Sequence, residues 1–154
     1  MTEPILGHGP SKELVTGATG LVGMERLVYR LERGWPTVAL HRASSDVGRV
    51  EAFLRERLGE GFAAAWSGLE WREADLSDVG ALEDAMEGCD RVFHAAGRVS
   101  FRSGDEDRLK AVNAVGTANV VNAALASSIH RLVHISSVAA LGRSGVDPET
   151  GDRL

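Results

Sequence analysis

Short apolar segments alternate along the chain with longer segments whose apolar residues recur at helical spacing. The short segments run into glycine or polar turn residues, which predicts strands of four to six residues. Helical spacing is clearest over residues 21–31, and Gly34 ends that pattern. A helix after Ser77 is expected to be N-capped near that residue. Strands are expected at 13–16, 36–40, 69–73, 91–96 and 132–136. Helices are expected from residue 21 to a stop at Gly34, and at 46–58, 78–87 and 106–127.

This alternation predicts an α/β fold of the Rossmann type, a doubly wound parallel sheet with helices on both faces. Five strands are expected, whereas a complete classical sheet of this kind has six or more. We therefore expect the chain to stop partway through a larger fold, after the fifth strand. One domain is expected over residues 12–142, between a flexible leader at 1–11 and an irregular tail at 143–154.

The composition of the chain mainly excludes certain classes of function and site. The chain has 44% hydrophobic and 25% charged residues, which is typical of a soluble globular protein. Its 17 Lys and Arg are scattered among 22 Asp and Glu, with a net charge of -5, and this argues against nucleic-acid binding. A single cysteine excludes an internal disulfide and a cysteine-based metal cluster. Without a membrane-length apolar run or a signal-peptide pattern, a cytoplasmic protein with no membrane span is expected.

A glycine-rich loop joins the first expected strand to the first expected helix. It reads TGATGLVG over residues 16–23. Gly17 permits a tight turn, Gly20 lets a phosphate approach the backbone, and Gly23 lets the helix pack closely on the strand. Free N–H groups at a helix N-terminus favour negative charge, so the pyrophosphate of NAD or NADP is expected here. The residues expected at this site are Thr16, Gly17, Thr19, Gly20, Leu21, Val22 and Gly23.

The end of the second expected strand bears on the choice between NAD and NADP. In NAD-binding sites an acidic residue about 20 positions beyond the glycines binds the ribose hydroxyls. Here the segment reads LHRAS over residues 40–44, without a carboxylate. Arg42 and Ser44 can instead hold a 2′-phosphate through charge-assisted hydrogen bonds. NADP is therefore expected in preference to NAD, the alternative being that Arg42 is only a surface charge.

The TGxxGxxG spacing resembles the signature of the extended short-chain dehydrogenase/reductase family, which includes NAD-dependent epimerases and dehydratases. Four later segments resemble motifs of this family in the same order: DL at 75–76, VFHAAG at 92–97, NAVGTANV at 113–120 and LVHISS at 132–137. In the family the Asp of the DL pair contacts adenine and the helical Asn helps to orient the active site, although a solvated helix Asn is the alternative here. The further cofactor-site residues that the resemblance implies are Asp75, Leu76, Ala95, Ala96, Gly97 and Asn113.

The resemblance also implies hydride transfer to or from a carbonyl or hydroxyl group of a small-molecule substrate, using a Ser, a Tyr and a Lys. Ser137 matches the serine that polarises the substrate oxygen, and Ser136 is its neighbour. Tyr29 is the only tyrosine and has Arg33 four residues later, so the family's YxxxK motif is absent from these residues. We expect the 154 residues alone to bind the cofactor without catalysing hydride transfer.

The sequence is compatible with several alternative activities. Leu141 stands where sugar-nucleotide epimerases commonly have an aromatic residue, which favours a branch similar to dihydroflavonol reductases or 3β-hydroxysteroid dehydrogenases. A sugar-nucleotide epimerase or dehydratase and a nonenzymatic NADP-binding sensor are the alternatives. His94 and His134, on neighbouring strands, are expected to pack or hydrogen-bond rather than to bind a metal. An open edge at the fifth strand is expected to favour a homodimer or another association through that edge.

Overall fold

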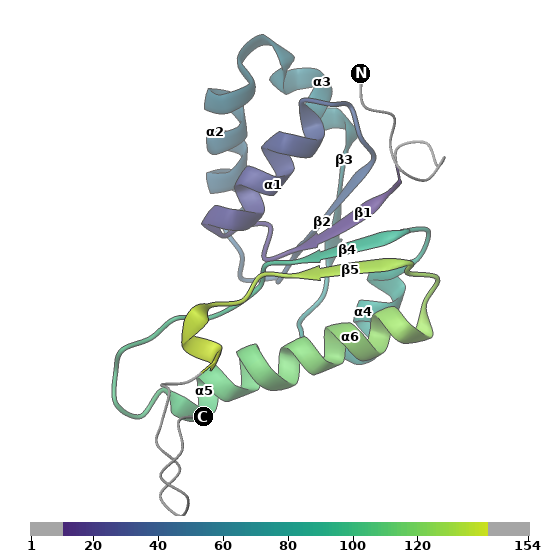
Figure 1. Cartoon of the computed structure of the whole chain (residues 1–154). Helices are drawn as coiled ribbons and strands as arrows, with labels where there is room; N and C mark the ends of the chain where they lie inside the picture. Colours follow the sequence, from purple (N-terminus) through teal and green to yellow (C-terminus); the bar gives the residue numbers. More distant parts are fainter. Residues whose placement is uncertain (1–10, 142–154) are drawn as a thin grey trace, which may run out of the picture.

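The computed structural model describes residues 11–141, and there the apolar strands form one parallel sheet with helices on both faces (Figure 1). The strand order is β3-β2-β1-β4-β5, and each neighbouring pair is parallel. The predicted Rossmann-type fold is confirmed. The domain boundaries stay a prediction, because the expected leader, apart from Ser11, and the expected tail lie outside the described residues. The strands are β1 (Glu13–Thr16), β2 (Thr37–His41), β3 (Leu69–Glu73), β4 (Arg91–His94) and β5 (Arg131–His134).

Two apolar cores lie on opposite faces of the sheet. Along β1 successive side chains point to opposite faces, so Leu14 packs in one core and Val15 in the other. All four residues of β1 are buried, as expected for a central strand covered on both sides. The helices α1 (Leu21–Leu31), α2 (Val47–Leu58) and α3 (Phe62–Gly68) cover the Val15 face, and α4 (Val79–Met86) and α6 (Thr117–Ala126) cover the other (Figure 1).

Some element boundaries differ from the sequence-based expectation. Residues 59–68, to which the sequence assigned no element, form a turn, η1 (Gly59–Gly61), followed by α3. This helix is too short to show a helical period, and it is held by the burial of Phe62. The N-cap of α4 is Asp78, whose carboxylate accepts the Ala81 N–H at 3.0 Å, and not Ser77.

The region expected as one long helix is divided. It consists of α5 (Glu106–Lys110), a π-helical segment η2 (Ala111–Gly116) and α6. The strands β4 and β5 each end two residues earlier than expected, and a short turn, η3 (Val138–Leu141), follows β5. π-Helical segments within α-helices are frequent at functional sites.

The strand order determines where a ligand can bind. From β1 the chain proceeds to β2 and β3 on one side and then crosses to β4 on the other. At such a switch point a crevice opens at the carboxyl ends of the strands, between β1 and β4. Among the described residues β5 pairs only with β4, and association through this edge stays a prediction. No helix in residues 11–141 is long and apolar enough to cross a membrane.

Candidate functional site

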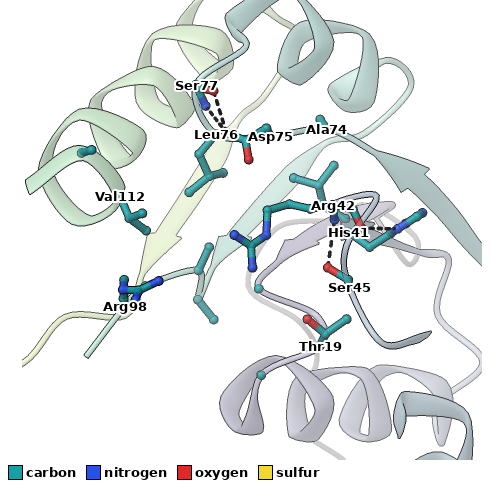
Figure 2. Close-up of a pocket in the computed structure, with 17 residues that line it drawn as sticks. Thr19, His41, Arg42, Ser45, Ala74, Asp75, Leu76, Ser77, Arg98 and Val112 are labelled. Atoms are coloured by element: carbon teal, nitrogen blue, oxygen red, sulfur yellow. Dashed lines mark hydrogen bonds between the residues drawn. The ribbon is translucent and has the colours of Figure 1, made fainter. Parts of the chain in front are cut away.

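A cleft of ≈ 340 Å³ lies at the carboxyl ends of the strands (Figure 2). This volume is within the range of small-molecule sites. The segments that follow β1, β2, β3 and β4 all contribute to its lining, together with the start of η2. The residues that line it are Gly17, Thr19, Gly20, Leu40, His41, Arg42, Ser45, Ala74, Asp75, Leu76, Ser77, Ala95, Ala96, Gly97, Arg98, Ala111 and Val112.

The loop after β1 is pressed against the end of β4. Gly17 has a φ of 66°, in the left-handed region that favours glycine. A Cβ at Gly17 would lie 2.6 Å from the Ala96 nitrogen and 2.7 Å from the Ala95 carbonyl oxygen. The Gly20 N–H donates to the Gly17 carbonyl at 2.9 Å and closes the turn. Only glycine therefore fits at position 17, for steric reasons as well as conformational ones.

The helix α1 begins directly after Gly20, which lines the cleft. Its N-cap, Gly20, has no side chain that could bond the first N–H groups, and the first turn contains no acidic residue. The side chains of Leu21 and Val22 are exposed. A Cβ at Gly23 would lie 2.1 Å from the Gly17 oxygen, so Gly23 lets the helix pack on the loop rather than on the strand as expected. The N–H groups and the helix dipole are therefore available to an anion.

Arg42 follows β2 and extends into the cleft (Figure 2). The Arg42 N–H donates to the Ser45 hydroxyl at 3.0 Å, and the Ser45 N–H donates to the Arg42 carbonyl at 2.8 Å. This tight turn places Ser45 in the cleft. Ser44, the expected partner, faces an adjoining depression that Arg42 and Asp75 also line. Of the two serines only Ser45 lines the cleft itself, and the expected role of Ser44 stays a prediction.

Asp75 and Leu76 follow β3 and lie in the cleft, as the resemblance implied. The Asp75 carboxylate accepts the hydroxyl of Ser77 at 2.6 Å and its N–H at 2.9 Å. These hydrogen bonds, with a smaller contribution from the nearby charge of Arg42, lower the pKa of Asp75. Asn119 of α6 donates to the Leu76 carbonyl at 2.8 Å and holds the loop in place.

Asn113 lies in η2 and binds the protein backbone. Its Oδ1 accepts the Arg98 N–H and its Nδ2 donates to the Arg98 carbonyl, each at 2.8 Å. The amide therefore fixes the segment that leaves β4, and with it the position of Arg98 in the cleft. Asn113 itself does not line the cleft.

The structure brings most of the expected cofactor residues together. Those that line the cleft are Gly17, Thr19, Gly20, Arg42, Asp75, Leu76, Ala95, Ala96 and Gly97. The expected site residues outside its lining are Thr16, Leu21, Val22, Gly23, Ser44, Asn113 and Ser137. Arg98 and Ser45 were missed, although both directly follow or adjoin motifs that the sequence identified. Ser137 is exposed just beyond β5, where its carbonyl accepts the Ala140 N–H at 2.9 Å.

Thr16 is fully buried and faces His94 rather than the cleft. Its Oγ1 lies 2.6 Å from His94 Nδ1 and accepts the Ala96 N–H at 3.3 Å. The His94 ring stacks on His134 with 5.0 Å between ring centroids. The two histidines thus pack and His94 hydrogen-bonds, as expected. No group of three or more metal-binding side chains occurs in the described part of the chain.

Burial of His94 predicts a loss of stability in mild acid. Desolvation, with a smaller contribution from His134, lowers the pKa of His94 to about 4 from the usual 6.5. As the pH falls from about 6.5 to about 4, His94 binds a proton in the unfolded chain but not in the folded chain. The free energy of unfolding therefore decreases. We expect a loss of about 2–3 kcal/mol between pH 7.5 and 4.5, measured by urea unfolding.

The matched variant is His94→Phe, which removes the titrating group but keeps a ring. Its free energy of unfolding should lack this dependence on pH, whatever its absolute stability. Glu70 and Asp75 have lowered pKa values, so these carboxylates contribute mainly below this window. Equal slopes for wild type and variant between pH 6.5 and 4.5 would contradict the assignment.

The sequence model for the NAD dependent epimerase/dehydratase family matches residues 13–153. "Sterol demethylase protein B" of Methylococcus capsulatus is 36% identical over 129 residues, or 84% of this chain and 35% of the relative. A "putative dihydroflavonol 4-reductase" of Synechocystis is 35% identical over 131 residues, or 85% of this chain and 34% of the relative. The chain therefore spans about a third of the length of these curated relatives.

The fold is also found among solved structures. A short-chain dehydrogenase/reductase superfamily protein from Agrobacterium tumefaciens, solved with bound NAD, is 28% identical to this chain with a TM-score of 0.61. The match covers 88% of this chain and 35% of that protein.

Proposed function

The chain belongs to the NAD dependent epimerase/dehydratase family, and we propose that its cleft holds a nicotinamide dinucleotide as the cofactor-binding portion of an oxidoreductase. The reaction proposed for the whole protein is hydride transfer to or from a carbonyl or hydroxyl group of a small molecule. The observation that carries the proposal is the close contact of Gly17 with the Ala95–Ala96 backbone beneath an uncapped helix N-terminus.

The residues present fit such a cofactor. Without side chains at Gly17 and Gly20, a pyrophosphate can approach the backbone closely, and the first turn of α1 offers N–H groups without a competing carboxylate. In the proposal Asp75 and Leu76, which line the β3 side of the cleft, hold the adenine. Residues 95–97 are two alanines and a glycine, and these small residues leave room for the dinucleotide along the β4 side of the cleft.

When bound, the nicotinamide ring supplies or accepts the hydride. In the proposal this chain binds and orients the dinucleotide, and the Ser137 hydroxyl polarises the substrate oxygen. The relatives named as reductases favour reduction over epimerisation for the whole protein.

We further propose that NADP is preferred over NAD because Arg42 supplies the positive charge at the ribose position. A guanidinium binds a phosphate through paired, charge-assisted hydrogen bonds, which a ribose hydroxyl cannot match. Ser45 and Ser44 flank the same position from the cleft and from the adjoining depression. The acidic Glu73 and Asp78 also line that depression, and their negative charges reduce the preference for the 2′-phosphate of NADP over the ribose hydroxyl of NAD.

Fluorescence titration of the chain with NADPH and NADH tests both proposals. NADPH is expected to bind more tightly, and Arg42→Ala is expected to weaken NADPH binding by about 10- to 100-fold while changing NADH binding by less than about threefold. Arg49→Ala, an exposed arginine on α2 outside the cleft, is the matched control for the change in charge. Tighter binding of NADH by the wild type would refute the NADP preference, and binding of neither would refute the cofactor site.

A further inference from the structure

A chain of hydrogen bonds runs behind the cleft and connects β1, β4 and α6. The Ala96 N–H donates to Thr16 Oγ1 at 3.3 Å, and Thr16 Oγ1 lies 2.6 Å from His94 Nδ1. On the other side of the ring, His94 Nε2 lies 3.0 Å from Thr117 Oγ1. A side chain at Gly17 would clash with the nitrogen of Ala96. This series of hydrogen bonds therefore ends next to the glycine loop.

The direction of these hydrogen bonds follows from the proton count. Thr16 Oγ1 already accepts the Ala96 N–H, so its own proton is available for His94 Nδ1. If Nδ1 were protonated instead, Thr16 Oγ1 would accept twice and its proton would need a third partner in a fully buried site, which is costly. The neutral ring therefore carries its proton on Nε2 and donates it to Thr117.

The surroundings of His94 favour this neutral form. Thr16 of β1 and Thr117 of α6 face the two ring nitrogens, and His134 of β5 stacks on the ring face. Of these three groups only His134 is ionisable, and a positive charge on it would oppose a second one on His94. Burial together with His134 lowers the pKa of His94 to about 4.

We propose that His94 is a positioning residue that, as the neutral Nε2–H tautomer, orients the Thr16 hydroxyl and thereby sets the Ala95–Ala96 wall of the nucleotide cleft. This proposal rests on the proposed nucleotide-binding function. His94 touches no ligand in this scheme. It acts by keeping the Thr16 lone pair directed at the Ala96 N–H, and loss of the acceptor at Nδ1 releases that hydroxyl to rotate.

Two substitutions at position 94 separate positioning from packing. His94→Phe keeps a ring but has no acceptor, whereas His94→Asn leaves space but places an amide oxygen near the position of Nδ1. We expect His94→Phe to weaken nucleotide binding by about tenfold and His94→Asn by at most about threefold, even if His94→Asn is less stable. A purely structural role predicts the reverse order, and an equal affinity for both variants and wild type would overturn the proposal. His134→Phe is the control on the stacked partner.

If the His94 variants fail to fold, the same contrast is available at Thr16. Thr16→Val keeps the shape and loses the hydroxyl, whereas Thr16→Ser keeps the hydroxyl and loses a methyl group. Thr16→Val should lose affinity about tenfold and Thr16→Ser should retain most of it. Loss in Thr16→Ser to the same extent would contradict positioning through the hydroxyl.

The tautomer itself is read from the ring ¹⁵N shifts of His94 in the wild-type chain at pH 7. Protonated Nε2 and unprotonated Nδ1 are expected, and protonated Nδ1 would overturn the chain of hydrogen bonds even if the nucleotide binds. A wild-type chain that shows the expected tautomer but binds neither NADPH nor NADH would refute the proposed function, and with it the role of His94 in binding. The two failures are therefore distinguishable.

Discussion

Gly17→Val is expected to abolish binding of both NADPH and NADH, with an affinity loss of at least about a hundredfold. The added side chain meets backbone atoms of Ala95 and Ala96 at 2.6 to 2.7 Å, and these cannot move without displacing the end of β4. The positive φ of Gly17 adds conformational strain for a β-branched residue. The glycine loop would be forced away from the cleft that it closes. Titration of the folded variant with each nucleotide measures the loss.

Gly34→Val is the matched control for the strain alone. Gly34 has a φ of 64°, close to that of Gly17, but a Cβ there meets nothing within 4 Å. Its variant should lose stability and keep nucleotide binding. Gly20→Ala tests the loop with a smaller change, because its φ is negative and its Cβ would lie 3.3 Å from the Gly17 oxygen. Wild-type affinity in Gly17→Val would show that the loop does not hold the pyrophosphate.

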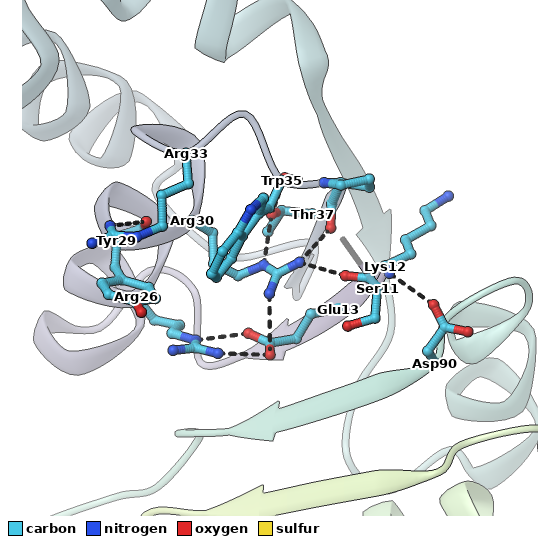
Figure 3. A network of polar contacts seen from close by, with 11 residues as sticks. Ser11, Lys12, Glu13, Arg26, Tyr29, Arg30, Arg33, Trp35, Thr37 and Asp90 are labelled. Carbon is cyan, nitrogen blue, oxygen red and sulfur yellow. Dashed lines mark hydrogen bonds and ion pairs between the residues drawn. The ribbon is translucent and has the colours of Figure 1, made fainter. Parts of the chain in front are cut away.

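Glu13→Ala is expected to reduce the free energy of unfolding by about 3–5 kcal/mol, because it leaves the buried Arg30 charge, and the partly buried Arg26, without a carboxylate. Figure 3 shows Glu13 between two arginines of α1 at the amino end of β1. Arg26 binds both carboxylate oxygens at 2.7 Å, and Arg30 Nη1 lies 3.4 Å from Oε2. Glu13 and Arg30 are 3% and 1% exposed, so solvent cannot replace the lost charge.

The surroundings of Arg30 make this loss hard to compensate. Its guanidinium also donates to the Thr37 hydroxyl at 3.0 Å and to the carbonyls of Ser11 and Pro36 at 2.7 and 2.8 Å (Figure 3). Burial lowers the pKa of Arg30, although an arginine keeps its charge at neutral pH. The side chain is therefore held in place as a cation when Glu13 is removed.

An exposed pair of the same residue types supplies the control. Glu25 and Arg57 form an ion pair in which both side chains are nearly half exposed. Glu25→Ala should change the free energy of unfolding by less than about 1 kcal/mol. Urea unfolding at pH 7 compares the two variants, and equal effects would show that burial of the Glu13 network is unimportant. Nucleotide affinity of Glu13→Ala should be unchanged when the chain is folded, because the network lies at the opposite end of β1 from the cleft.

Local sequence patterns predicted much of the fold because they act over a few residues. The apolar strands and the helix from Leu21 to Leu31 have the expected type, and α1 begins at the expected residue. Gly17 was recognised because a tight turn after a strand requires glycine whatever surrounds it. Where an element is very short or two adjacent residues can both act as a cap, the sequence did not identify the element or the capping residue. The helix α3 was missed, and Asp78 rather than Ser77 caps α4.

The carboxyl ends of parallel strands meet at one edge of a sheet, so the sequence by itself determined that the glycine loop, Arg42 and Asp75 would share one cleft. Only the tertiary structure decided which side chains point into it. Thr16 and His94 are 78 positions apart and meet because β1 and β4 are neighbours in register. The partners of Glu13 are likewise decided by how α1 packs across β1. Periodicity specifies that a position is buried, but the identity of its partner depends on contacts between elements that no local pattern encodes.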